Sequence, residues 1–158
     1  MKKVKILRIF LIILIVLWTL LIFSFSSQDG GESSGLSRMV VEIFVKDPEL
    51  VNKIEPYARK IAHFSEYGLG GILFISLFST YGWSDRRKIT TSISLGVWYA
   101  IMDEVYQLMI PGRSGALKDV YIDSLGFSTG VIGTLIIIKI FELMKEKRNK
   151  MQETKVNK

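Results

Sequence analysis

The sequence predicts an all-α polytopic membrane protein, in which four transmembrane helices form a bundle accompanied by a short extracellular amphipathic helix. Two observations lead to this prediction. The apolar residues fall into four blocks, each long enough or nearly long enough to cross a hydrocarbon core, which takes about 20 helical residues. The charged residues crowd into the gaps between these blocks and into the C-terminal tail. The length of 158 residues allows one transmembrane domain, placed at residues 1–144, with a charged cytoplasmic tail at 145–158.

The first span is predicted at about residues 6–25. A basic N-terminus precedes an uncharged apolar run over residues 9–23. A cleaved signal peptide is the alternative, with Ser24 and Ser26 as the small residues before the cut. The apolar run is at the upper end of the usual length of about 7–15 residues for a signal sequence, and it contains Trp18, so a retained helix is favoured.

A short amphipathic helix follows the first span. Its apolar residues recur at helical spacing, which predicts a helix of about ten residues. These residues are Leu36, Met39, Val40, Ile43 and Phe44. Lys46-Asp47-Pro48 ends it. The segment is too short and too charged to cross a bilayer, so we expect it to lie on the membrane surface or to cover the polar residues described below.

The other three spans are predicted at about residues 60–82, 89–110 and 118–142. The uninterrupted apolar part of the second span, residues 69–78, is too short alone, so this span must include His63 and Glu66. A basic loop at 84–88 leads into the third span, and Pro111-Gly112 turns the chain toward the fourth. The tail beyond Lys145 is charged and lacks periodicity, so we expect it to fray.

Orientation follows from the positive-inside rule, which places both termini and the 84–88 loop in the cytoplasm of a multi-pass protein of the cell membrane. Basic residues also occur on the opposite side, so the asymmetry is moderate. Removal of the first helix as a signal peptide would leave the other three spans in the same orientation. The predicted outer face is therefore independent of that alternative.

Ionisable residues of three spans fall at one depth. At about 1.5 Å per residue, helices running in alternating directions place these residues, and the polar Gln107, in the outer third of the membrane and its interface: His63, Glu66, Asp103, Glu104, Asp119 and Asp123. A charged side chain at the bilayer centre costs at least about 2.5 kcal/mol, so an intramembrane ionisable residue is a functional hypothesis by default.

The helical faces agree with this depth. One face of the second span carries Arg59, His63, Glu66 and Gly70, and one face of the fourth carries Asp119, Asp123, Gly126, Gly130 and Gly133. Small residues at this spacing allow two helices to approach closely. We therefore expect a glycine groove on the fourth span and acids that point into the bundle, away from lipid.

Four segments in order resemble the motifs of the VanZ-like membrane proteins. They are Phe25-Ser26-Ser27-Gln28, residues 59–67, residues 103–107, and Pro111-Gly112-Arg113-Ser114-Gly115 followed by Asp119, Asp123 and Gly126. The resemblance covers nearly the whole chain. It implies a protein of the cell envelope with a link to resistance against the glycopeptide teicoplanin, and it implies no particular reaction.

These patterns give a set of candidate site residues. The candidate catalytic residues are His63, Glu66, Asp103, Glu104, Asp119 and Asp123. The candidate substrate-binding residues are Arg59, Lys60, Gln107, Arg113, Ser27 and Gln28. Glu66, Asp103 and Asp123 are the best candidate metal ligands.

Oxygen ligands suit Mg²⁺ or Mn²⁺, whereas a single histidine and no cysteine argue against zinc. The absence of a Walker loop argues against a nucleotide. The simpler interpretation of His63 is an interfacial histidine bonded to a neighbouring acid.

Three functions fit these residues. The first is binding or modification of a membrane lipid or lipid-linked cell-wall precursor at the outer leaflet, with the basic residues holding phosphate. The second is a non-catalytic scaffold or surface-shielding protein, in which the acids form an internal salt-bridge network with Arg59 and Arg113. The third is a proton-coupled transporter, against which stands the lack of acids in the inner half of the spans. Enzymatic activity and homo-oligomer formation stay open, and nothing points to nucleic acid.

Overall fold

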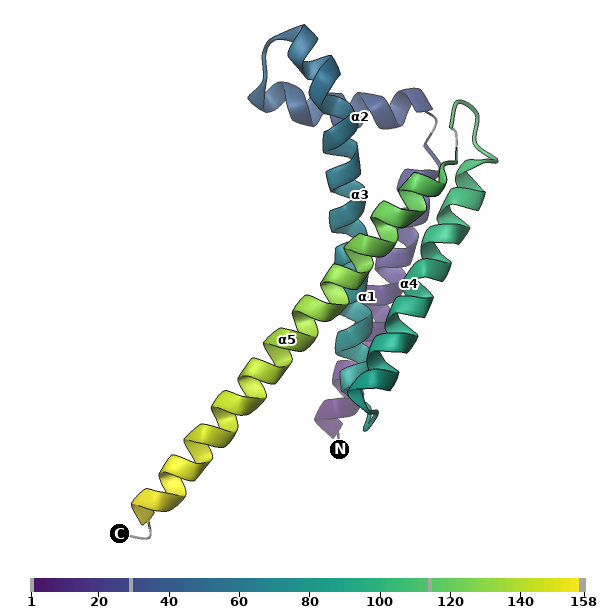
Figure 1. Ribbon diagram of the computed structural model, residues 1–158. Coiled ribbons are helices and arrows are strands. Elements are labelled where there is room, and N and C mark those ends of the chain that lie inside the picture. The colour runs from purple at the N-terminus through teal and green to yellow at the C-terminus, as the bar shows by residue number, and fades with distance from the viewer. Residues whose placement is uncertain (1, 29, 114, 157–158) are drawn as a thin grey trace.

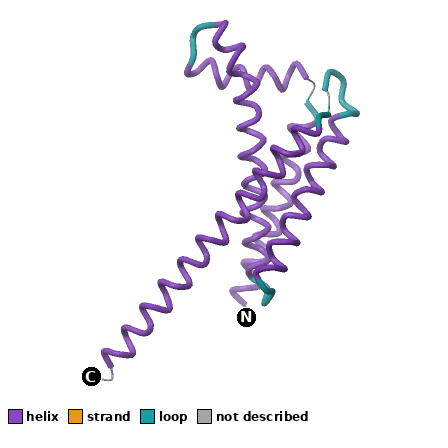
Figure 2. Tube along the Cα trace, in the orientation of Figure 1, coloured by secondary structure: helices purple, strands orange, loops and turns teal. Residues whose placement is uncertain are grey.

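The computed structural model describes residues 2–28, 30–113 and 115–156. These residues form five helices and no strand, which confirms the all-α class (Figures 1 and 2). The helices are α1 (Lys2–Ser26), α2 (Gly30–Phe44), α3 (Pro48–Ser79), α4 (Asp85–Gln107) and α5 (Leu117–Val156). Four of them run up and down beside one another, and α2 lies across one end of the bundle (Figure 1).

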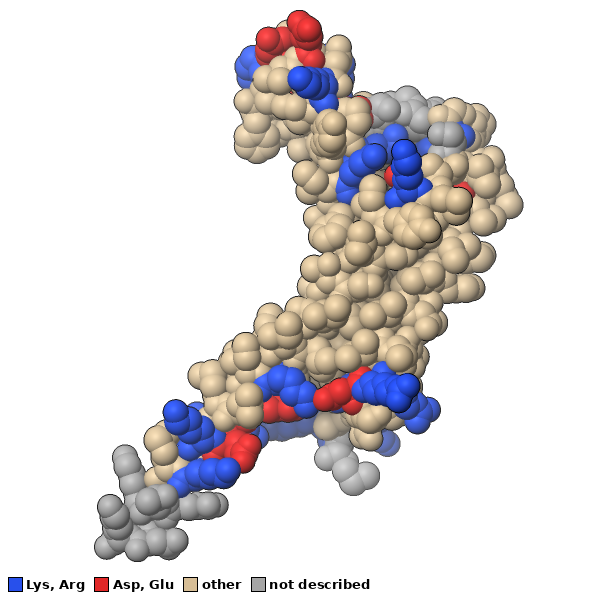
Figure 3. All heavy atoms as spheres, in the orientation of Figure 1, with Lys and Arg blue, Asp and Glu red and all other residues tan. Residues whose placement is uncertain are grey.

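The bundle has two chemically different ends. We call the end that holds the N-terminus of α1 and the loop between α3 and α4 the basic end, and the opposite end, beneath α2, the pocket end. Charged side chains gather at both ends on the face drawn in Figure 3, and a belt without them lies between. A belt of this kind is what the hydrocarbon core of a membrane requires.

Three helices, α1, α3 and α5, are long and apolar enough to cross a membrane. The side chains of α1 are mostly exposed although the helix is strongly apolar, as expected where lipid is the neighbour. The helix α4 packs against α3 and α5, but basic residues in its first turn and two acids near its end make it less apolar than the other three. The chain is thus a multi-pass membrane protein, and a fourth crossing by α4 stays a prediction.

The helix α3 begins about one turn of chain after α2 ends, earlier than the predicted second span. Asp47 is its N-cap, and the carboxylate accepts hydrogen bonds from the backbone N–H groups of Glu49 and Leu50. Pro48 occupies the first turn, where a missing N–H is tolerated. The segment Lys46-Asp47-Pro48 therefore ends one helix, as predicted, and also starts the next. The additional turns of α3 provide the surface on which α2 packs.

The helix α5 continues to Val156, so the prediction that the tail frays from Lys145 is wrong within the described residues. The tail is rich in residues of high helix propensity, which do not need an apolar face to stay helical. Charged pairs one turn apart add to this preference: Lys150 lies 2.6 Å from Glu146, and Lys139 lies 3.5 Å from Glu142.

The backbones of α3 and α5 touch along the predicted glycine groove. A Cβ atom added at Gly126 would overlap the carbonyl oxygen of Phe64, and one added at Gly130 would overlap that of Gly68. At Gly133 an added Cβ would meet nothing within 4 Å. The groove is confirmed at Gly126 and Gly130, and it ends before Gly133 because the two helices diverge there.

Trp18 joins α1 to the other three long helices. Its indole is 4% exposed, and its Nε1 donates a hydrogen bond of 2.8 Å to the carbonyl oxygen of Glu66. The ring meets Tyr67 and Tyr99 edge-on, at centroid distances of 6.0 Å and 5.2 Å, and Phe127 at 6.2 Å. Gly70 leaves the space that the indole fills. Trp18 is therefore a packing residue and not an interfacial anchor.

Candidate functional site

Polar side chains from three helices are buried together at the pocket end. Each is at most 6% exposed: Ser26 on α1, Asp103, Glu104 and Gln107 on α4, and Asp123 on α5. His63 on α3 is partly buried and faces them. The acids of α4 and the inner acid of α5 thus point into the bundle, as the helical faces predict. Their functional role stays a prediction.

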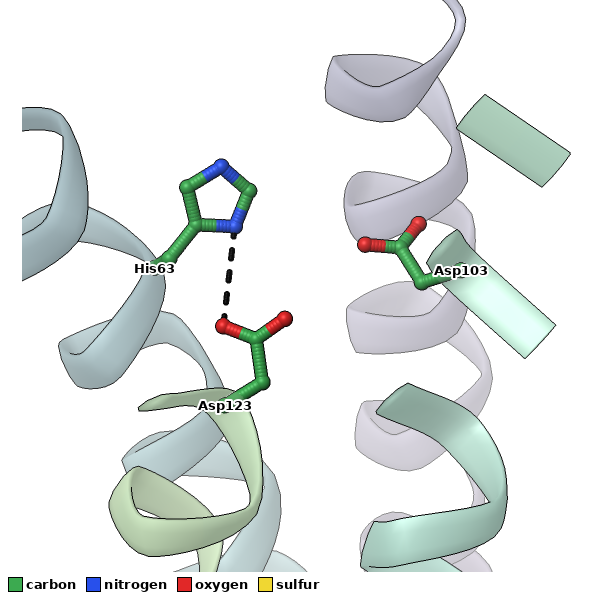
Figure 4. A group of neighbouring side chains, drawn as sticks. All are labelled: His63, Asp103 and Asp123. Atoms are coloured by element: carbon green, nitrogen blue, oxygen red, sulfur yellow. Dashed lines mark ion pairs between the residues drawn. The ribbon is translucent and has the colours of Figure 1, made fainter. Parts of the chain in front are cut away.

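Three side chains meet at the centre of this group, and we call His63, Asp103 and Asp123 the central trio. One donor atom from each lies within 4.8 Å of the other two. The His63 Nδ1 atom lies 3.8 Å from Asp123 Oδ1, which is beyond hydrogen-bond distance (Figure 4). Each side chain comes from a different helix, so the trio exists only when α3, α4 and α5 are assembled.

The carboxylates of the central trio accept few hydrogen bonds. Asp103 Oδ2 accepts a hydrogen bond of 3.1 Å from Gln107 Nε2. The other oxygen of Asp103 and both oxygens of Asp123 accept none from the described residues, although they are buried. A buried carboxylate without donors is strongly unfavourable unless a proton or a cation neutralises it. A proton or a bound cation must therefore neutralise these carboxylates.

Glu104, the other buried acid of α4, forms a hydrogen bond with the segment that connects α4 to α5. Its Oε2 accepts a hydrogen bond of 2.7 Å from the backbone N–H of Ala116, directly before the first turn of α5. This contact fixes the α4–α5 connection and therefore the position of Asp119 and Asp123 along α5. Glu104, predicted as catalytic, has at least this structural role.

Arg113 links the ends of α1 and α4. Its guanidinium donates to the carbonyl oxygens of Phe25 and Gln28, at 2.8 Å and 3.1 Å, and to Gln107 Oε1 at 3.1 Å. Gln107, oriented in this way, donates to Asp103. Substrate binding by Arg113 stays a prediction. In the structure its guanidinium orients Gln107, which in turn donates a hydrogen bond to the carboxylate of Asp103.

We expect Arg113→Lys to loosen this link even though the charge is kept. A lysine offers a single ammonium group and cannot reach three acceptors in a plane, so at least one buried acceptor loses its donor, at about 1–3 kcal/mol. Thermal unfolding in detergent measures the loss. Arg38→Lys is the matched control, because the contacts of Arg38 with Glu42 and with Asn52 of α3 are both exposed to solvent, and it should change stability by no more than about 1 kcal/mol. Equal effects of the two variants would contradict the link.

A cavity of about 340 Å³, which we call the polar pocket, opens beside the trio between α3, α4 and α5. Its lining is mostly polar: Glu55, Pro56, Arg59, Lys60, His63, Glu104, Gln107, Gly112, Arg113, Asp119, Ile122 and Asp123. Lys and Arg side chains gather at this end on the face drawn in Figure 3, with acidic atoms visible between them. Among the described residues, Arg59 and Lys60 form no ion pair or hydrogen bond, and they share the pocket lining with the acids Glu55, Glu104, Asp119 and Asp123.

A second cavity of about 520 Å³, which we call the apolar groove, runs between α1, α2 and α3. Apolar residues of all three helices line it, among them Leu21, Phe25, Leu36, Met39, Val40 and Leu69. Arg59 and His63 line both cavities, and Glu66 lines the groove alone. The two cavities therefore share a wall made of one cationic and one imidazole side chain.

The structure brings together most of the predicted site residues and separates a few. Arg59, Lys60, His63, Glu104, Gln107, Arg113, Asp119 and Asp123 line the polar pocket, and Asp103 lies behind them in the trio. Glu66 lines the groove and is not one of the three residues whose donor atoms converge, so the metal set of Glu66, Asp103 and Asp123 stays a prediction. Ser27 is exposed and donates to Ser24, and Gln28 contributes its carbonyl oxygen to Arg113 and lines the groove.

Two features of the site went unpredicted. Ser26 lies within 3.5 Å of Gln107 Nε2, and the spacing of Trp18, Ile22 and Ser26 along one face of α1 is the signal that identifies it. The apolar groove depends on the angle at which α2 packs on α3, for which the sequence offers no signal. The salt-bridge network predicted for the acids with Arg59 and Arg113 stays a prediction; among the described residues Arg59 forms no ion pair, and Arg113 donates to Gln107 and to backbone carbonyl oxygens.

Comparison with known proteins gives one match. A family model described as VanZ/LLP1 matches residues 10–141, a range that contains both cavities and the central trio. No curated protein and no solved structure matches the chain.

Proposed function

The chain belongs to the VanZ/LLP1 family of membrane proteins, and from this we propose that it binds a lipid-linked substrate of the cell envelope at the outer leaflet. In this proposal a phosphate or pyrophosphate headgroup occupies the polar pocket, and the attached lipid chain occupies the apolar groove. Capture of such a wall precursor would also be the link to glycopeptide (teicoplanin) resistance. The family resemblance and the two adjoining cavities support the proposal.

The observation that carries the proposal is the wall that the two cavities share. An amphiphile needs a polar site and an apolar site within the length of one molecule, and the polar pocket adjoins the apolar groove at Arg59 and His63. A soluble anion would use only the polar pocket, and a simple hydrocarbon only the groove. The pair of cavities therefore favours a ligand with both parts.

The charges at the wall fit an anionic headgroup. Arg59 and Lys60 are free of ion pairs among the described residues, and an arginine binds phosphate oxygens through two parallel N–H bonds. The buried acids lie deeper, so the two cations stand between them and an incoming anion. The cations attract the headgroup, and the carboxylates limit how deeply it enters.

The orientation rests on the charges of the basic end. The N-terminal residues of α1, the first turn of α4 and the distal half of α5 are rich in Lys and Arg, and the positive-inside rule assigns such an end to the cytoplasm. The pocket end then faces the outer leaflet, and α2 is extracellular. A headgroup in the polar pocket would lie at the depth where lipid headgroups occur.

The test is binding of a long-chain polyprenyl pyrophosphate to the full chain in nanodiscs, with inorganic pyrophosphate as the second probe. Loss of a charge-assisted hydrogen bond costs about 1.5–3 kcal/mol, so Arg59→Gln combined with Lys60→Gln should weaken binding of the polyprenyl probe by at least about tenfold. Inorganic pyrophosphate should bind much more weakly than the lipid, because it leaves the groove empty.

The control is Arg38→Gln combined with Lys53→Gln, which removes two cations from α2 and α3 that line neither cavity. It should leave the affinity within about twofold, since general electrostatic attraction falls off over a Debye length of about 10 Å. If both double variants weakened binding equally, or if the lipid and the free anion bound equally well, the proposed site would be wrong.

A further inference from the structure

The central trio carries a chemistry that lipid binding alone does not require. Its members come from three helices, their donor atoms converge, and two of them are carboxylates at most 1% exposed. Three of the four carboxylate oxygens accept no hydrogen bond from the described residues. A bundle that only needed to be stable would be expected to place apolar residues at these positions, or to supply each oxygen with a donor.

We infer that His63, Asp103 and Asp123 bind one divalent metal ion, and that Mn²⁺ is the ion which this donor set fits. Two carboxylates and one neutral imidazole contribute two negative charges, which a divalent cation balances. Carboxylates favour Mg²⁺ and Mn²⁺, and an imidazole favours a transition metal, so Mn²⁺ satisfies both kinds of ligand. The inference stands apart from the lipid proposal, because the ion can be measured without lipid substrate.

The distances suit such a site. Metal–ligand bonds to imidazole nitrogen and carboxylate oxygen are about 2.0–2.2 Å long, so two ligands at right angles on the ion are about 3 Å apart and two on opposite sides are about 4–4.4 Å apart. The donor atoms of the trio lie within 4.8 Å of one another, and His63 Nδ1 lies 3.8 Å from Asp123 Oδ1, so the side chains have to close by about 1 Å when the ion binds. Figure 4 shows the two carboxyl groups and the imidazole ring turned toward the space between them.

The surroundings orient one ligand and leave access to the site. Gln107 donates to Asp103 Oδ2 and is itself held by Arg113, which is the kind of outer contact that fixes a metal-binding carboxylate. His63 and Asp123 also line the polar pocket, so an ion enters from that side. With three protein ligands, further coordination positions are open to water or to phosphate oxygens in the pocket.

The test is titration of the metal-stripped full chain in detergent with Mn²⁺, with free Mn²⁺ measured by electron paramagnetic resonance. We expect about one ion per chain, and at least about tenfold weaker binding in Asp123→Asn and in His63→Gln. Glu49→Gln is the matched control, because Glu49 is an exposed acid of the same helix as His63 and lines neither cavity. It should bind Mn²⁺ as the wild type does.

Two further measurements keep the test decisive if a variant folds poorly. Mn²⁺ should raise the melting temperature of the wild type and of Glu49→Gln but not that of Asp123→Asn, whose metal-free form should be at least as stable as the metal-free wild type. Pulsed resonance spectra of the wild type should show coupling to an imidazole nitrogen, for which His63 is the sole source in the sequence. Absence of Mn²⁺ binding by the wild type, or equal binding by Asp123→Asn, would overturn the inference while leaving the lipid proposal untouched.

Discussion

Gly130→Leu is expected to abolish the assembled bundle. A Cβ atom at this position would overlap the carbonyl oxygen of Gly68, and backbone cannot move aside as a flexible side chain can. The helices α3 and α5 would have to separate over the turns that place His63 beside Asp123. Inserting atoms into a packed core usually costs about 1–3 kcal/mol, and a clash with backbone should exceed about 4 kcal/mol, the range in which single substitutions unfold proteins.

The effect is measured as the fraction of protein that stays in the monodisperse size-exclusion peak after heating. The control is Gly133→Leu. Gly133 lies on the same helix, three residues further on, and an added Cβ there meets nothing within 4 Å. The control should melt within a few degrees of the wild type, because the leucine would face open space and leucine favours the helix over glycine. If the two variants melted alike, close contact between the backbones would not be what holds α3 to α5.

Trp18→Ala should detach α1 from the other helices. The indole is buried against rings from α3, α4 and α5, and removing a buried tryptophan usually costs about 3–5 kcal/mol. The carbonyl oxygen of Glu66 also loses the N–H of Trp18. Trp18→Phe should fall between the wild type and the alanine variant, because it keeps ring packing and loses only the donor and part of the volume.

Trp98→Ala is the control for this series. The Trp98 side chain is 53% exposed and contacts Tyr99 alone among the aromatic rings of the described residues, so its loss should lower stability by less than about 1 kcal/mol. Melting in detergent followed by circular dichroism compares the three variants. A Trp98 effect as large as that of Trp18 would mean that burial among the rings of α3, α4 and α5 is not the reason for the effect of Trp18→Ala.

The parts of the structure that follow from helical spacing could be predicted. Asp123, Gly126 and Gly130 repeat on one face of α5, and the structure places that face against α3 and the pocket. The inward direction of Asp103 follows from its position one turn before Gln107. These features depend only on the geometry of a single helix, which a sequence determines well.

The features that were wrong or missed depend on how helices meet. The spacing of three residues predicts one helical face for His63 and Glu66. Three residues along a helix leave the two side-chain directions about 60° apart, and Glu66 lines the groove while His63 belongs to the trio. The donors of Arg113 go to the carbonyl oxygens of Phe25 and Gln28, and such contacts leave no mark in the spacing of side chains. The tail of α5 stays helical through local propensity, although its amphipathic period is lost.

The length of α5 has a consequence for the membrane in which the protein resides. Forty helical residues measure about 60 Å, about twice the thickness of a hydrocarbon core. Contact with α3 holds its first half, Lys139 pairs with Asp85 of α4 at 2.8 Å, and beyond Lys139 the side chains through Gln152 are exposed. Packing up to Lys139 therefore sets the tilt of α5, and a change in bilayer thickness should change only the angle of the charged part beyond it.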